Sequence, residues 1–176
     1  MATHPDRVAE QTLIQYGIVQ PPVPVEELVA RMGIQLVYQP FDGELSGILY
    51  QEDDHAIIAI NLQNARVRQR FTIAHECGHY VLHQRDRDLF IDKPIQVQFR
   101  NELSSLAVNR EEIAANRFAA ALLMPRDWIM AEANRRLEQQ PHLTDEGLLA
   151  ELTHLFEVSP RAMEYRLANL GIWAPL

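Results

Sequence analysis

The fold of this chain is decided by residues 70–80, which read RFTIAHECGHY. They lie inside a longer stretch, residues 65–83, that contains no proline. Apolar or small residues recur in that stretch every three or four positions: Val67, Phe71, Ala74, Gly78 and Leu82. Such spacing is typical of a helix face that packs against a core. The sequence therefore predicts one long helix over residues 65–83.

Within this helix, the five residues from His75 to His79 match the HExxH pattern. Residues four apart lie on one helix face with Cβ atoms ~5–6 Å apart, so His75 and His79 can bind the same cation. Glu76 is turned ~100° round the helix axis from His75. Its carboxylate can therefore lie beside the metal and accept a proton from a metal-bound water. The pattern predicts two metal ligands, His75 and His79, and a general base, Glu76; a chance match on an ordinary helix is the less favoured alternative.

A second strong helix is expected over residues 110–124, with Asn109 as its N-cap. Two histidines leave a tetrahedral zinc site incomplete, and Glu112, near the start of this helix, is the candidate third ligand. Asn116 follows one turn later on the same face and can accept a hydrogen bond from the second ring nitrogen of a metal-binding histidine. Two alternatives stay open for Glu112. Glu111, which points ~100° away, could be the ligand instead, and Asn109 with Glu112 has the spacing of a capping box.

Shorter elements surround these two helices. Apolar periodicity with helix-start and helix-stop residues predicts helices over residues 5–16, 25–32, 127–137, 144–156 and 160–170. Strand formers, which we expect to build a small antiparallel sheet, occupy residues 34–38, 47–51 and 56–61. Residues 85–108 are expected to be mostly loop, with a possible edge strand at 95–99. A chain of 176 residues fits one α+β domain spanning residues 1–176.

Composition narrows the range of functions. Lys and Arg total 16 against 24 Asp and Glu, a formal charge of -8, which argues against nucleic acid as the main partner. The longest apolar runs fall short of the ~18 residues that a membrane span needs. The single cysteine, Cys77, cannot form an internal disulfide, and no secretory leader is recognisable. We therefore expect a cytoplasmic protein without a membrane or nucleic-acid partner.

Residues 143–176 contain the last two expected helices, whose spacing imitates a helix-turn-helix. This segment has five acidic residues against two arginines, the wrong sign for binding DNA phosphates. We expect the helical pair to pack against the rest of the chain or against a partner protein. Tyr165, Arg166 and His154 are side chains of the kind that can stabilise an oxyanion on a scissile carbonyl, although most such residues on a terminal helix face solvent.

Two segments carry a resemblance to a known family. They are Arg70–Tyr80 and Ala115–Pro125, and the likeness extends to Ser46-Gly47, Asn61 and Val158–Met163. From about Val25 onward the chain resembles the ImmA/IrrE family of bacterial metallopeptidases. The resemblance implies a zincin-like site of the gluzincin type in a compact α+β domain. It also implies a helix-turn-helix repressor of the XRE type as protein substrate, whose cleavage relieves repression after a stress or induction signal.

Two residues depart from the family pattern. Cys77 stands where relatives often have a larger apolar residue, and a buried cysteine packs as a small hydrophobe. Ala114 stands where many relatives have a second glutamate, which leaves Glu112 as the better match for the ligand.

From the motif and the resemblance together we expect a zinc-dependent endopeptidase, although Mn²⁺ or another divalent ion could fill the same ligand set. The alternative is a regulatory or antitoxin-like binding protein of the same fold that sequesters a partner, and a DNA-binding regulator is the least favoured.

Overall fold

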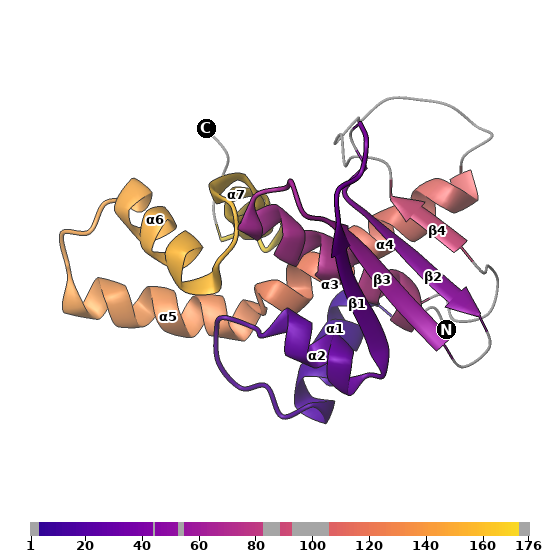
Figure 1. Ribbon diagram of the computed structural model, residues 1–176. Helices are drawn as coiled ribbons and strands as arrows, with labels where there is room; N and C mark the ends of the chain where they lie inside the picture. Colours follow the sequence, from indigo (N-terminus) through magenta and orange to yellow (C-terminus); the bar gives the residue numbers. More distant parts are fainter. Residues whose placement is uncertain (1–3, 44, 53–54, 83–88, 93–105, 173–176) are drawn as a thin grey trace.

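The computed structural model describes residues 4–43, 45–52, 55–82, 89–92 and 106–172, which form an α+β fold (Figure 1). The helices are α1 Pro5–Gln15, α2 Val25–Arg31, α3 Arg66–Leu82, α4 Leu106–Leu123, α5 Arg126–Gln139, α6 Asp145–Phe156 and α7 Pro160–Asn169. The strands are β1 Ile34–Gln39, β2 Gly47–Glu52, β3 His55–Asn61 and β4 Leu89–Asp92. The helices and strands expected from periodicity are confirmed, and only the start of α4 differs by more than two residues. In these described ranges, no helix has the length and apolar character to cross a membrane.

The sheet has the strand order β1-β3-β2-β4. β3 pairs antiparallel with β2 but parallel with β1, and β2 pairs antiparallel with β4. The prediction of an antiparallel sheet is therefore wrong, because the sheet is mixed. β3 inserts between β1 and β2, which run in opposite directions, so it must lie parallel to one of them. Alternation along a strand shows which side chains share a face, but it does not show which strand lies alongside.

Asn61, at the end of β3, holds the segment that joins β1 to β2. Its Nδ2 donates to the carbonyl of Leu45 at 2.8 Å, and its Oδ1 accepts from the backbone N–H of Gln63 at 3.0 Å. The side chain is buried, and a buried amide is stable only with such partners. Asn61 therefore fixes the crossing that puts β3 in the centre of the sheet.

β4 is an element that the sequence did not indicate, since it lies in the stretch expected to be loop. Its 4 residues, LFID, show no alternation of apolar and polar side chains. Its pairing with β2, and not its own sequence pattern, makes it a strand. The possible edge strand at 95–99 lies outside the described residues.

α3 contacts the sheet through β2 and β3 and contacts α4 and α2 along its length (Figure 1). The contact with the sheet is close, because a Cβ atom on Gly47 of β2 would lie 2.4 Å from Cγ2 of Thr72. Glycine is the residue that leaves room for such an approach. Ile73, Ala74 and Cys77 of α3 are fully buried. The helix that contains the HExxH pattern is thus held in the interior of the protein.

Two buried arginines tie the C-terminal helices to the rest of the chain. Arg70 of α3 donates from Nε to the carbonyl of Glu157, in the α6–α7 turn, at 3.2 Å. Arg166 of α7 donates from Nε to the carbonyl of Met124 at 3.0 Å and from Nη1 to the carboxylate of Asp6 in α1 at 2.8 Å. Both arginines are shielded from water. These bonds hold α6 and α7 against the core. The interpretation of α6 and α7 as a helix-turn-helix-like pair stays a prediction.

Candidate metal centre

His75 and His79 lie one turn apart on α3 with their imidazoles turned toward each other. The two Nε2 atoms are 3.0 Å apart, and the ring planes meet at 75°. Both side chains are buried. Because one helix supplies both residues, their spacing follows directly from the helical repeat. The HExxH pattern therefore produces the pair of converging nitrogens that the sequence predicted.

Glu112 of α4 completes a triangle of ligand-type atoms with these two nitrogens. Its Oε2 lies 3.3 Å from His75 Nε2, and its Oε1 lies 3.2 Å from His79 Nε2. Ligand atoms placed 2.0–2.1 Å from a tetrahedral ion are roughly 3.3–3.4 Å apart, and each of these two oxygen–nitrogen separations is close to that value. Over the described ranges of the chain, these three residues are the one group of His, Cys, Asp or Glu placed to hold a metal ion.

The structure argues against both of the alternatives that were open for Glu112. The capping box is wrong, because α4 begins at Leu106 and Asn109 lies within the helix instead of at its N-cap. The extra turn adds Leu106, Ala107 and Val108, three consecutive apolar residues that show no helical periodicity by themselves. Glu111 is not among the residues whose ligand atoms converge. The geometry therefore favours Glu112 over Glu111 as the third ligand.

The carboxylate of Glu112 is held in its ionised form. Burial raises its pKa, but hydrogen bonds and charge interactions with His75 and His79 outweigh burial and leave the pKa of Glu112 well below its usual range. An ionised carboxylate is the form that binds a cation. The site therefore offers one negative charge and two imidazoles, a donor set typical of divalent metals in proteins.

Asn116 fixes the tautomer of His75. The Nδ1–H of His75 donates to the amide Oδ1 of Asn116 at 3.2 Å. When the ring is neutral, its proton on Nδ1 leaves a lone pair on Nε2. When the ring is protonated, the same Nε2 donates to the Glu112 carboxylate that it faces. The hydrogen bond expected for Asn116 is present, and it leaves Nε2 as the ring nitrogen of His75 that faces Glu112.

Two other residues of the motif have distinct surroundings. Glu76 is fully buried and lies one residue beyond His75 on α3. Cys77 is also fully buried, with its Sγ 3.7 Å from the sulfur of Met32. Burial raises the pKa of the Cys77 thiol to about 12, so the thiol stays protonated and packs as an apolar group. The chemistry of the motif therefore rests on its carboxylate and not on its cysteine.

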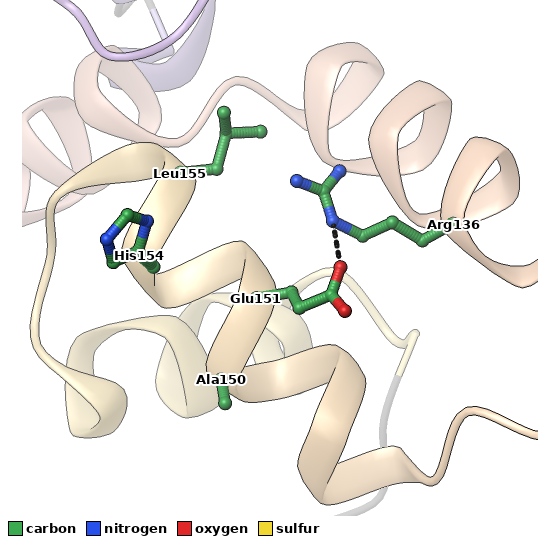
Figure 2. A pocket seen from close by; sticks show the side chains of 5 residues that line it. All are labelled: Arg136, Ala150, Glu151, His154 and Leu155. Carbon is green, nitrogen blue, oxygen red and sulfur yellow. Dashed lines mark ion pairs between the residues drawn. The ribbon is translucent and has the colours of Figure 1, made fainter. Parts of the chain in front are cut away.

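The three oxyanion candidates all lie on α6 and α7. Arg166 uses its guanidinium on Met124 and Asp6, and Tyr165 accepts a hydrogen bond from exposed Arg161. His154 lines a cleft of about 410 Å³ between α5 and α6, shown in Figure 2. The lining also includes Arg136 and Glu151, whose side chains form an ion pair at 2.8 Å. This cleft contains none of the three candidate metal ligands.

The family model described as the IrrE N-terminal-like domain, of the M78 peptidases, matches residues 29–168. The chain belongs to the ImmA/IrrE family. This ImmA/IrrE member is 34% identical over 137 residues to the radiation response metalloprotease IrrE of Deinococcus radiodurans, and 34% identical over 141 residues to that of Deinococcus deserti. Each match covers 78% of this chain but only 37% and 43% of the two IrrE proteins. The chain therefore spans less than half the length of these relatives.

Two further comparisons add a phage protein and a solved structure to the proteins that this ImmA/IrrE member resembles. It is 28% identical over 134 residues to the uncharacterized immunity region protein 2 of Bacillus phage phi105, covering 76% of this chain and 78% of the phage protein. A solved structure of a Mycobacterium tuberculosis transcriptional regulator matches 93% of this chain and 46% of its own, with a TM-score of 0.60 and 19% identity. That likeness concerns the fold. Membership of a metallopeptidase family implies a divalent metal ion, and His75, His79 and Glu112 are the described residues that fit one.

Proposed function

We propose that this chain is a zincin-like, zinc-dependent endopeptidase with its metal held by His75, His79 and Glu112. The observation that carries the proposal is the convergence of these three side chains from two helices on one point. Mn²⁺ or another divalent ion could occupy the same ligands. We further propose that residues 1–176 act as one domain, in the cytoplasm, where the single cysteine stays reduced.

The residues have separate roles in peptide hydrolysis. When bound, the metal lowers the pKa of a water molecule and polarises the scissile carbonyl. Glu76 takes the proton from the attacking water and then delivers it to the leaving amine nitrogen. Asn116 holds His75 in the tautomer that presents Nε2 to the metal. Glu112 supplies the negative charge that balances part of the charge of the ion.

We propose a helix-turn-helix repressor of the XRE type as the substrate, with cleavage relieving repression. Support comes from the ImmA/IrrE membership and from the names of two relatives, a radiation response metalloprotease and an immunity region protein. The first name states a response to radiation, and the second places an uncharacterized protein in the immunity region of a phage. The acidic chain, with a formal charge of -8, suits a protein partner better than DNA itself.

The test is incubation of the zinc-loaded protein with the repressor encoded nearest to its own gene, followed by mass analysis of the fragments. Wild type should cut the repressor, and Glu76→Gln should bind zinc but not cut. Glu27→Gln, at an exposed glutamate of α2, is the matched control and should cut normally. Cleavage by Glu76→Gln at the wild-type rate would contradict the general-base role. Stable binding of the repressor without cleavage by wild type would favour the sequestering alternative.

A further inference from the structure

The two helices that carry the metal ligands approach each other most closely at a glycine. A Cβ atom on Gly78 of α3 would lie 3.2 Å from both the Cα and the carbonyl oxygen of Ala115 in α4, and 3.1 Å from Cδ1 of Phe118. Ala115 and Phe118 are fully buried. Two of the three nearest atoms belong to the backbone of α4, which cannot rotate away as a side chain can.

This contact lies beside the ligands on both helices. Gly78 immediately precedes His79, and Ala115 lies between Glu112 and Asn116, directly before Asn116. His75 and His79 share α3, so their mutual spacing does not depend on α4. The distances from Glu112 to both histidines, and from Asn116 to His75, do depend on the separation of α3 and α4.

We propose that Gly78 is a positioning residue, which sets the separation of α3 and α4 and thereby the affinity of the site for its metal. The inference rests on the metal site of the proposed function, but not on peptidase activity. A Cβ atom at this position requires α4 to move by a few tenths of an ångström. Metal-ligand distances are usually kept within about 0.2 Å, so Gly78→Ala shifts Glu112 and Asn116 beyond the tolerance of the site.

The expected effect is on metal binding more than on folding. Alanine has a higher helix propensity than glycine in a helix interior, which offsets the strain of the added methyl group in the folded protein. Loss of the hydrogen-bonding partner of a metal ligand typically weakens metal affinity about 10–100-fold, and misplacement of a ligand adds to that effect. We therefore expect Gly78→Ala to fold and to bind zinc at least about tenfold more weakly than wild type.

Gly147→Ala in α6 is the matched control. Its added Cβ would also be crowded, but by side-chain atoms of Leu143 and Thr144 and away from the metal ligands. The zinc dissociation constant is measured by competition with a chelator, and the absorption spectrum of the Co²⁺-loaded protein reports ligand geometry. Gly78→Ala should weaken zinc binding and alter the Co²⁺ spectrum, while Gly147→Ala should match wild type in both. Wild-type affinity and spectrum in Gly78→Ala, or an equal loss in Gly147→Ala, would overturn the proposal.

A double variant separates the backbone contact from the side-chain contact. Gly78→Ala/Phe118→Leu removes the clash with the ring and leaves the clash with the Ala115 backbone, so its zinc affinity should stay low. Full recovery would overturn the role of helix separation. The double variant also decides the matter if Gly78→Ala does not fold. Wild type that binds no zinc would refute the proposed function itself, whereas unchanged binding by the variants refutes only the positioning role of Gly78.

Discussion

Metal binding should raise the thermal stability of the protein. The size of the increase can be worked out from the metal concentration relative to its Kd and from the length of the domain. His75, His79 and Glu112 already converge, so binding requires little reordering of side chains. A ligand that binds only the folded state, at 100 times its Kd, stabilises that state by ~2.7 kcal/mol. For a domain of this length each kcal/mol raises the Tm by ~2–4 °C. Zinc at that concentration should therefore raise the Tm by about 5–11 °C.

The variants Glu112→Gln and Glu111→Gln test which of the two carboxylates binds the metal and so produces the rise in Tm. Each substitution removes one negative charge from adjacent positions of α4, so the net charge of the two variants is the same. Thermal unfolding is followed by circular dichroism, first with zinc and then with a chelator. Wild type and Glu111→Gln should show the full zinc-dependent rise in Tm, and Glu112→Gln should show little of it. A full rise in Glu112→Gln, or its loss in Glu111→Gln, would refute the ligand assignment.

Three further predictions concern the surroundings of the site. Asn116→Ala should weaken zinc binding about 10–100-fold, measured by chelator competition, and unchanged affinity would show that Asn116 does not orient His75. Burial raises the pKa of Asp6, but the hydrogen bond and charge of Arg166 outweigh it and leave that pKa below its usual value. Asp6 therefore stabilises the fold above its unfolded-state pKa, and this contribution is lost as the pH falls through its folded-state pKa; Asp6→Asn should show a weaker loss of stability on acidification in urea unfolding. Phe156→Ala, at a fully buried side chain of α6, should cost about 3–5 kcal/mol of stability without changing the zinc Kd, and a lost zinc site would mean that α6 supports the metal directly.

The parts of the site that one helix supplies could be predicted from the sequence alone. The positions of His75 and His79 follow from the helical repeat, because residues four apart share a face whatever surrounds the helix. The position of Glu112 depends on how α4 packs against α3. Periodicity does not specify the relative position of two helices. The prediction of Glu112 rested on tetrahedral incompleteness and on the family resemblance. The structure supports it with distances of 3.3 and 3.2 Å to the histidine nitrogens.

Two of the errors share a physical cause, because both concern the long-range pairing of strands. The mixed sheet depends on β3 entering between β1 and β2, and β4 depends on its hydrogen bonds to β2. Asn109 resembled an N-cap because asparagine favours that position, but α4 begins at Leu106. The propensity of a residue indicates which secondary structures it can adopt. Tertiary contacts then decide which of these it adopts in the folded protein.

The ion pair between Asp6 and Arg166 has a consequence for any attempt to shorten this chain. The family model begins at residue 29, so a fragment trimmed to that boundary would keep Arg166 and discard its counter-charge on α1. A guanidinium left in a dry interior without its anion is severely destabilising. We therefore expect a fragment that folds stably to include α1, which lies upstream of the segment that the family model matches.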